Sequence, residues 1–430
     1  MGQATAQPAG RMSRYRWVIV SLLFAACTIN YIDRQMIGVL KASVFVGENS
    51  EFKWTEKDYG DVVFYFQFAY AVAYLGFGKV VDMFGARLGY AIAILVWTIA
   101  HMAHGMVNTV TQLALARAGL GIGEAGNFPG GIKAVTEWFP RRERAFATGL
   151  FNAGSNIGAI LTPLLLALII NVWGFDWRAA FYLTGVFGVI LLLAWWMIYR
   201  RPTEKPQVSA AELAHIQQDG DNGVAKIGWF DVISRRETWA YALGRFCIDP
   251  IWWFFLFWLP GYLAEHYKLD LAASALPLAA IYLISDFGSI GGGWMSSKLI
   301  AMGKSINFAR KVTMLLCAVL VLPIWFAQDV ASVWGAVLLI GLATAGHQAF
   351  SANLYTLPSD MFPQSAVGSV IGIGGTVGAV GGMFMAKFTG YVLDTTHSYA
   401  LLFAIAACAY LLALLIIQLL SPRLAPVAIN

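Results

Sequence analysis

The chain has 430 residues, of which 59% are hydrophobic and 12% charged, and its formal net charge is +5. A soluble domain carries about 25% charged residues, so this composition excludes an ordinary soluble protein and indicates an integral membrane protein. No block of basic residues with interleaved aromatic residues is present, which argues against nucleic-acid binding. The four cysteines fall in apolar segments without metal-ligand partners at useful spacing, so we expect no metal, no cofactor and no disulfides.

Twelve apolar segments follow one another along the chain, each long enough to cross a bilayer as a helix of about 20 residues. Segments of a β-barrel would alternate apolar and polar residues instead. In chain order, the predicted spans are 17–41, 59–81, 88–107, 109–138, 144–171, 179–199, 238–264, 273–298, 309–327, 331–357, 366–391 and 398–420. We therefore expect an all-α membrane protein with twelve transmembrane helices.

A polar stretch of mixed charge divides the predicted spans into six and six. The expected parts are a cytoplasmic tail (1–16), an N-terminal six-helix bundle (17–199), a cytoplasmic linker (200–237), a C-terminal six-helix bundle (238–420) and a second cytoplasmic tail (421–430). Basic residues gather before the first span and after the fourth and eighth spans, whereas the loop 42–58 is rich in acidic residues. By the positive-inside rule, both termini and the linker face the cytoplasm.

The two halves repeat each other around the fourth and tenth spans. At one constant offset, Phe139, Gly149 and Gly158 correspond to Phe362, Gly372 and Gly381. The match indicates a duplication into pseudo-symmetric halves, an architecture that places a transport site at the midplane. Small residues spaced four apart are expected to let two helices pack backbone to backbone; they are Gly154 and Gly158, and Gly374, Gly378 and Gly382.

Four charged residues lie inside the first and fourth spans: Asp33, Arg34, Arg117 and Glu124. Each such charge costs roughly 2.5–3.5 kcal/mol at the centre of a membrane helix. Arg117 and Glu124 share one helix face but lie roughly 10 Å apart along it, too far to pair with each other. Asp33 and Arg34 are therefore their expected partners, in a network that either carries protons or only braces its half.

A second motif lies at the cytoplasmic end of the second span, where the sequence runs from Gly78 to Arg87. The spacing of Gly78, Asp82, Gly85 and Arg87 resembles the signature loop of the major facilitator superfamily, although Met83 replaces the usual arginine. Such a loop is expected to gate the conformational change. The alternative is an ordinary turn.

Several other polar or aromatic side chains inside the spans are candidates for substrate contact, namely Tyr31, Tyr70, Ser155, Trp252, His347, Gln348 and Ser351. For each, packing within the bundle is the competing interpretation. Arg245 and Asp249 stand at i and i+4, a spacing that predicts an internal ion pair. No role is assigned to Asp286.

Taken together, these residues resemble the anion:cation symporter family of the major facilitator superfamily. Two strings, Asp249 to Phe254 and His347 to Leu354, are similar to those of bacterial hexuronate transporters. The resemblance implies that Asp33 and Glu124 couple protons, and that Arg34, Arg117, Tyr31 and Tyr70 contact substrate. Aldonate transporters of this family have an asparagine where Gly374-Gly375 stands here, which argues against an aldonate.

The sequence thus predicts a monomeric transporter in the bacterial inner membrane that imports a hexuronate, such as glucuronate or galacturonate, with protons. Its expected partners are the small organic anion, protons and the lipid bilayer. Within the same fold, the alternatives are a carrier of aldonate, tartrate or an aromatic carboxylate, or an exchanger without net proton flux. A membrane-embedded enzyme or a sensor is disfavoured, because no catalytic motif or soluble signalling domain is present.

Overall fold

The computed structural model describes residues 12–48, 50–218 and 229–427. Regular structure in these ranges is helical, apart from a β-bridge between Val46 and Trp54. Ten of the described helices are long and apolar enough to cross a membrane. The protein is therefore a multi-pass membrane protein.

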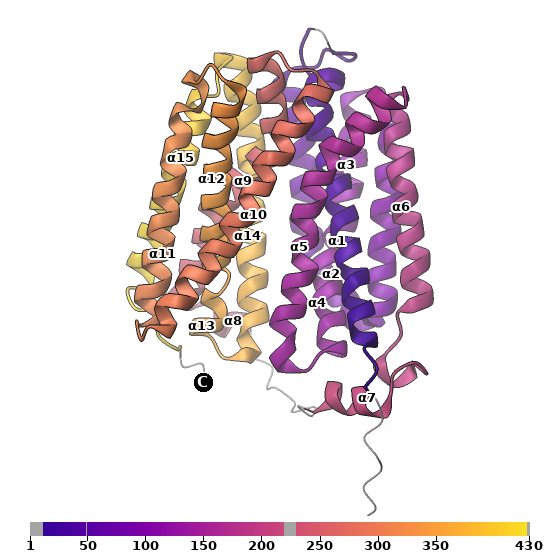
Figure 1. Cartoon of the computed structure of the whole chain (residues 1–430), viewed down its shortest axis with the longest axis vertical. Helices are drawn as coiled ribbons and strands as arrows, with labels where there is room; N and C mark the ends of the chain where they lie inside the picture. The colour runs from indigo at the N-terminus through magenta and orange to yellow at the C-terminus, as the bar shows by residue number, and fades with distance from the viewer. Residues whose placement is uncertain (1–11, 49, 219–228, 428–430) are drawn as a thin grey trace, which may run out of the picture.

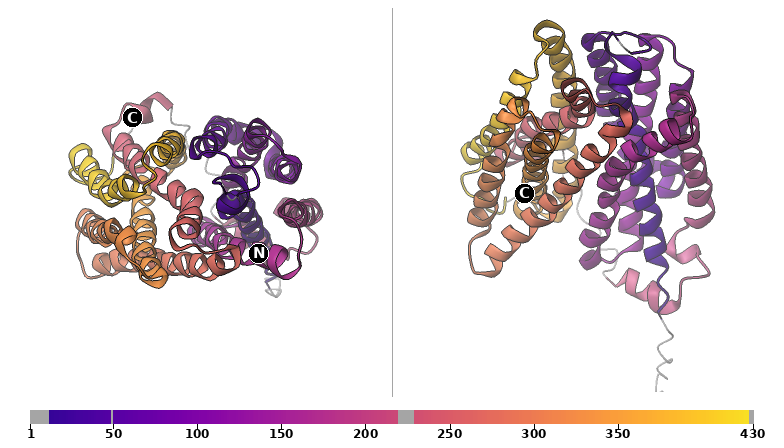
Figure 2. Two further views of the ribbon diagram at one scale, coloured as in Figure 1. Left: turned by 90° about the horizontal axis from the view of Figure 1, so that it is seen from above. Right: turned by 45° about the horizontal axis from the view of Figure 1, so that its top comes forward.

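The helices form two groups that lie side by side (Figures 1 and 2). The N-terminal group holds α1 (Tyr15–Leu40), α2 (Glu56–Ala103), α3 (Val110–Glu124), α4 (Asn127–Trp138), α5 (Arg141–Leu166) and α6 (Trp177–Ile198). The C-terminal group holds α9 (Arg236–Tyr267), α10 (Leu271–Ala301), α11 (Ile306–Val321), α12 (Val333–Leu354), α13 (Leu357–Met361), α14 (Gln364–Thr396) and α15 (Ala400–Leu420). Two short helices, α7 (Ala210–Gln217) and α8 (Trp229–Ile233), lie between the groups in sequence.

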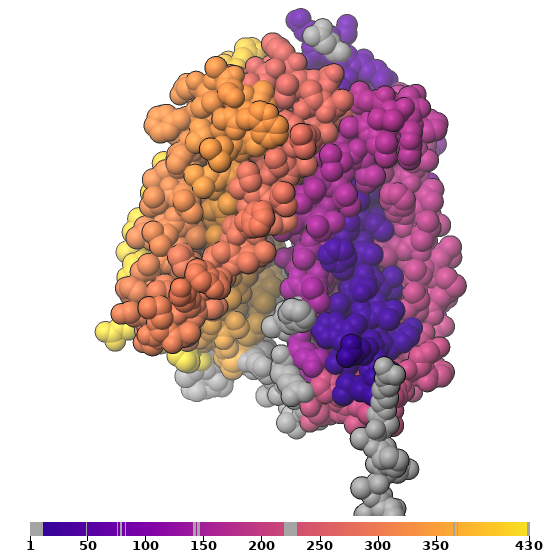
Figure 3. All heavy atoms as spheres, in the orientation of Figure 1, coloured from indigo at the N-terminus to yellow at the C-terminus, as the bar shows by residue number. Residues whose placement is uncertain are grey.

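We call the end of the molecule where α1 and α5 begin and α15 ends the basal end. The opposite end, formed by the turns at 41–55, 104–109 and 268–270, is the distal end. Figure 3 shows a hollow between the two groups at the basal end, whereas their atoms meet at the distal end. The two groups are therefore open to the basal side and closed on the other.

Two predicted spans, 59–81 and 88–107, form the two legs of α2, which are separated by a kink at Gly85. Thr55 and Asp58 form a capping box at its start, since each side chain accepts a hydrogen bond from the other residue's backbone N–H. Gly85 interrupts the helix with a φ of 75°, a conformation that glycine adopts at little cost. The predicted span 109–138 is instead divided into α3 and α4 by a turn at Ala125–Gly126.

Close helix packing follows the predicted small-residue stripes. A Cβ atom built on Gly154 or Gly158 would lie 2.4 Å from the carbonyl oxygen of Phe24 or 2.5 Å from that of Thr28, both on α1. The backbones of α1 and α5 are therefore in direct contact, as expected. On α14 the stripe contacts side chains of α9 instead, because a Cβ on Gly378 would lie 2.1 Å from Asp249.

The closed distal end is held by polar contacts between the groups. Lys41 is fully buried and forms an ion pair with Glu56 of its own group and another, of 3.2 Å, with Glu265 of α9. Asp394 of α14 accepts hydrogen bonds from the backbone N–H groups of Glu56 and Lys57, at 2.8 and 3.0 Å. The contacts of Glu265 and Asp394 join the two groups, whereas the Lys41–Glu56 pair lies within one group.

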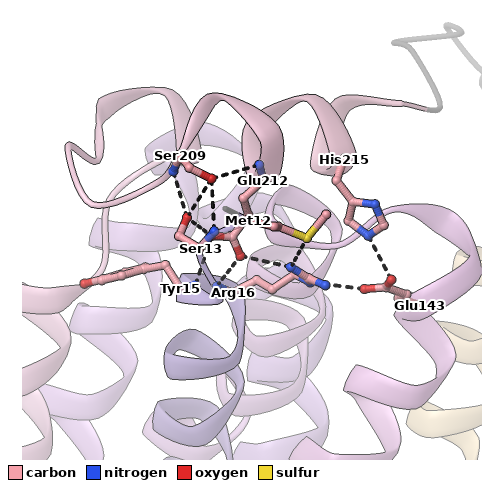
Figure 4. A network of polar contacts seen from close by, with 8 residues as sticks. All are labelled: Met12, Ser13, Tyr15, Arg16, Glu143, Ser209, Glu212 and His215. Atoms are coloured by element: carbon pink, nitrogen blue, oxygen red, sulfur yellow. Dashed lines mark hydrogen bonds and ion pairs between the residues drawn. The ribbon is translucent and has the colours of Figure 1, made fainter. Parts of the chain in front are cut away.

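At the basal end, the linker helix α7 is fastened to the N-terminal group (Figure 4). We call these contacts the basal clamp: Glu212 accepts hydrogen bonds from Ser13 and from the backbone and side chain of Arg16, and Glu143 binds Arg16 at 3.2 Å and His215 at 2.8 Å. The sequence predicted only a polar linker here. Ser209, which caps the start of α7, was the feature of the sequence that could have predicted this helix.

The basal clamp is expected to weaken in acid. Partial burial tends to raise the pKa of Glu143, but the hydrogen bond from His215 and the charge of Arg16 outweigh it and lower that pKa below its usual range. A lowered carboxyl pKa stabilises the folded form above the unfolded pKa, and this contribution is lost as pH falls through the folded pKa. Hydrogen exchange of α7, corrected for intrinsic rates, should show this loss below about pH 4.5. The Glu143→Gln variant should lack that pH dependence, and an identical profile in the variant would contradict the assignment.

Candidate functional site

The centre of the site is a buried ion pair between α1 and α3. Arg34 Nε donates to Glu124 Oε2 at 2.7 Å, and Arg34 Nη2 donates to Asn30 Oδ1 at 3.3 Å. The side chains of Arg34 and Glu124 are both buried. Asp33 and Arg34 were the expected partners of the charges on this helix, and Glu124 pairs with Arg34.

Aromatic rings surround the guanidinium of Arg34. Its Cζ atom lies 4.7 Å from the ring centre of Tyr31, 5.2 Å from that of Tyr70 and 5.0 Å from that of Trp253. Tyr31 and Tyr70 belong to the N-terminal group, whereas Trp253 belongs to α9. Cation–π contacts of this kind stabilise a desolvated guanidinium by about 2 kcal/mol. The arginine is thus enclosed at the contact between the two groups.

Arg117 is fully buried beside this pair. Its Nη1 atom donates to the backbone carbonyl of Arg34 at 3.3 Å, and its Cζ atom lies 4.2 Å from the ring centre of Phe66. The other two guanidinium nitrogens, Nε and Nη2, have no hydrogen-bond partner among the described residues. A buried donor without a partner is costly, so Arg117 has unused capacity to bind an anion.

Asp33 does not join Arg34 and Arg117. Its carboxylate lies on another face of α1, where Oδ1 is 3.2 Å from His101 Nε2 of α2. Neither oxygen makes a hydrogen bond within the described ranges. The expectation that Asp33 would partner Arg117 is therefore wrong: adjacent helical residues differ in direction by about 100°, so Asp33 and Arg34 face different neighbours.

A second cluster lies within the C-terminal group. The rings of Trp252 and His347 stack with 4.9 Å between their centres and 7° between their planes. His347 uses both ring nitrogens, Nδ1 with Tyr410 Oη at 2.7 Å and Nε2 with Ser351 Oγ at 3.2 Å. His347 therefore makes both of its hydrogen bonds inside its own group, and its ring packs against one face of Trp252.

Gln348 connects the two groups near the centre of the molecule. Its Nε2 atom donates to Asn156 Oδ1 of α5 at 3.3 Å, and Asn156 also interacts with Asp286 of α10. Ser155, which was expected to contact substrate, donates instead to the carbonyl of Asn152 on its own helix at 2.7 Å. The polar junction between the groups thus consists of Gln348, Asn156 and Asp286.

The predicted ion pair of α9 is confirmed. Arg245 Nη2 lies 2.6 Å from Asp249 Oδ2, and the guanidinium lies 4.9 Å from the ring of Tyr355. The neighbouring Gly374-Gly375 pair faces aromatic rings, since a Cβ on Gly374 would lie 2.2 Å from Tyr241. A Cβ on Gly375 would lie at ordinary contact distance, 3.4 Å, from Arg245 and from Tyr74.

The predicted gating motif is only partly described. Arg87 Nη2 donates to the carbonyl of Trp196 on α6 at 2.9 Å, and its Cζ atom lies 4.2 Å from the ring of that tryptophan. Gly85 forms the kink of α2. The side-chain surroundings of Gly78 and Asp82 lie outside the described part of the chain.

Comparison with known families matches residues 23–386 to the model of the Major Facilitator Superfamily. This chain belongs to the Major Facilitator Superfamily. It is a transporter and not an enzyme, as the sequence predicted.

Relatives and solved structures agree with this membership. The Escherichia coli K12 protein named "Probable L-galactonate transporter" is 32% identical over 417 residues, covering 94% of this chain and 88% of that protein. The "Hexuronate transporter" of the same strain is 28% identical over 408 residues, covering 94% and 93%. The crystal structure of a bacterial homologue of the human lysosomal transporter Spinster, in an inward-facing and occupied conformation, has a TM-score of 0.74 at 17% identity and covers 95% of this chain and 98% of that one. The last of these supports the fold alone.

Proposed function

We propose that this transporter imports a monovalent sugar acid together with protons by alternating access. The observation that carries the proposal is the buried Arg34–Glu124 pair beside the partly unsatisfied Arg117. The chain's similarity to transporters named for hexuronate and L-galactonate supports a sugar acid as the substrate. The leading candidates are glucuronate and galacturonate.

Charge balance gives the coupling mechanism. While Glu124 is ionised, it neutralises Arg34, and an entering anion gains little. When Glu124 takes up a proton, the guanidinium of Arg34 is released, and the substrate carboxylate replaces the lost negative charge. Proton and anion therefore favour each other's binding, as reciprocal linkage requires. Asp33 is the second proton-coupling acid in this proposal.

The remaining site residues surround the bound anion. Arg117 supplies Nε and Nη2 to the carboxylate, while Tyr31 and Tyr70 line the space beside Arg34. Trp252 offers a ring face to the sugar, held in place by His347 and Ser351, and Ser155 lies on the facing helix α5.

Movement of the two groups relative to each other would expose this site to one side and then the other. We assign the gating role to Gly78, Asp82, Gly85 and Arg87 at the basal side. In this proposal the two legs of α2 and the pair α3–α4 complete twelve crossings in two six-helix halves, with the domain limits given above. The chain is a monomer in a bacterial inner membrane, and both termini face the cytoplasm.

The test is uptake into proteoliposomes with an imposed pH gradient, using labelled glucuronate or galacturonate. The expected result is concentration of the sugar acid inside when the outside is acidic, and its loss when a protonophore is added. An exchanger would instead give uptake only into vesicles preloaded with substrate. That outcome would overturn the proposal of proton symport.

Galactonate is a second candidate, because the relative named for L-galactonate is 32% identical to this chain. Against it, Gly374-Gly375 stands where aldonate transporters of the family have an asparagine. Competition of unlabelled galactonate against labelled galacturonate distinguishes the two. Stronger inhibition by galactonate than by galacturonate itself would favour the aldonate.

Gln348 is expected to select sugar acids through their hydroxyl groups. The Gln348→Ala variant should weaken binding of galacturonate by roughly tenfold, about the worth of one hydrogen bond of 1.4 kcal/mol. Binding of a simple monocarboxylate should change less, because the arginines still recognise its charge. The measurement is competition uptake with both anions, and Gln418→Ala at the basal surface serves as the control. An equal loss for both anions would contradict this role.

A further inference from the structure

Two buried histidines lie outside the proposed substrate site, where α2 ends and the chain turns at the distal end. His101 and His104 contact Phe181 of α6, whose ring centre lies 5.2 and 5.3 Å from theirs. Both side chains are buried, but the chain reaches the surface directly afterwards, where Met106 is 70% exposed. His101 also lies 3.2 Å from Asp33. The histidines thus lie between the distal surface and an acid of the proposed coupling machinery.

The hydrogen bonds of His101 determine which of its nitrogens carries the proton. Thr184 Oγ1 donates its single hydrogen to the carbonyl of Ala180 at 2.8 Å. Toward His101 Nε2, which lies 2.8 Å away, the hydroxyl can therefore only accept. The Nε2 atom thus carries the proton and directs it toward Thr184, and Asp33 Oδ1 lies 3.2 Å from the same nitrogen. The Nδ1 atom holds a free lone pair and has no partner among the described residues.

His104 has the opposite arrangement. Its Nδ1 atom lies 2.7 Å from the carbonyl of Ala100, which can only accept, so Nδ1 carries the proton. The Nε2 atom is left with a lone pair and, in the described part of the chain, without a partner. The centres of the two rings are 6.2 Å apart, a separation that one water molecule can bridge.

We propose that His104 and His101 form a proton relay from the distal surface to Asp33. A proton taken up on the free Nε2 of His104 passes to the free Nδ1 of His101. The proton already on His101 Nε2 then passes to Asp33 Oδ1, which leaves a neutral ring protonated at Nδ1 and a neutral carboxyl group. The first tautomer returns when Nδ1 gives up its proton to a water molecule and Nε2 takes one up. The relay rests on the proposed function, in which Asp33 takes part in proton coupling, and it adds the route by which the proton arrives.

The surroundings suit transfer rather than storage of a proton. The charged groups near the two rings are Asp33 from α1 and Arg117 from α3, and α6 contributes Thr184 and Phe181. A lasting extra charge on these buried rings would carry a large desolvation cost. Asp33, whose two oxygens lack hydrogen bonds within the described ranges, is the acceptor at the end of the route.

The test compares proton-driven accumulation with exchange in His101→Gln. A glutamine amide can still donate toward Asp33 from the position of Nε2, but it cannot accept a proton on one side and release another. Accumulation driven by an acidic outside is expected to slow at least tenfold, whereas exchange between preloaded vesicles and medium should stay within twofold of the wild type. His104→Asn, which keeps the donor to Ala100, is expected to give the same pattern. His266→Gln, an exposed histidine at the distal end of α9, is the control.

Each outcome decides between the alternatives. Wild-type accumulation rates in both folded variants would overturn the relay. Equal loss of accumulation and exchange would also overturn it, because a purely structural pair would give that result. If the wild-type protein itself accumulates nothing along a pH gradient while exchange proceeds, the proposed symport fails instead. The dependence of the wild-type rate on external pH should be lost in both variants if the relay is correct.

Discussion

Glu124→Gln is expected to abolish concentration of substrate along a pH gradient while exchange continues. Glutamine keeps an oxygen that can accept from Arg34 Nε at the 2.7 Å contact, but it carries no charge at any pH. The guanidinium of Arg34 is then permanently available to the anion, so binding no longer depends on a proton. The inside-to-outside ratio should fall to one at every imposed gradient.

The measurement uses proteoliposomes assayed for both accumulation and exchange. Glu137→Gln is the matched control, because Glu137 lies on α4 and accepts a hydrogen bond from Tyr199 at 2.7 Å, away from the arginines. Asp33→Asn is assayed in parallel. If both Glu124→Gln and Asp33→Asn still concentrate substrate, neither acid couples the proton.

Arg117→Lys is expected to lower the apparent affinity for the sugar acid by at least tenfold. Lysine keeps the positive charge but replaces the planar fork of donors with a single ammonium group. The two free nitrogens of Arg117, Nε and Nη2, are the atoms that would bind a carboxylate side by side. A tenfold loss corresponds to about 1.4 kcal/mol of binding free energy.

Thermal stabilisation by galacturonate in detergent measures this affinity without requiring transport. Arg310→Lys is the matched control, since that arginine is bound to Asp360 and Ser296 in the C-terminal group, at 2.9 Å each. Unchanged affinity in a folded Arg117→Lys protein would remove Arg117 from the site. A parallel loss of stability without ligand would indicate a bracing role instead.

Much of this architecture could be predicted from the sequence, because a helix that crosses the lipid must consist mostly of apolar residues. The apolar runs predicted helices, and the seven-residue spacing of Arg117 and Glu124 correctly indicated that they would not pair with each other. The Arg245–Asp249 pair followed from spacing alone, since both partners lie on one helix.

Contacts between helices could not be predicted in the same way. His101 partners Asp33 because of how α1 and α2 are rotated about their axes, and no local pattern in the sequence records that rotation. The same applies to Trp253, which approaches Arg34 only when the two groups meet. His347 was selected for its position equivalent to Glu124 in the repeat, but its two hydrogen bonds remain within one group.

Lys41 at the distal end has a consequence for the opening of the protein to the other side. Its ammonium group lies between two carboxylates, of which Glu56 moves with it and Glu265 does not. When the two groups separate, Lys41 remains paired with Glu56. Only Glu265 loses its partner and must be hydrated as an isolated charge. At this point the closed state is favoured by the attraction between Lys41 and Glu265, in addition to the hydrogen bonds that Asp394 accepts. Solvent and ions reach the pair when the two groups separate. Dissolved ions weaken such an attraction once it is exposed to solvent, so the ionic strength of the medium at the distal side should help to set how long this end stays open.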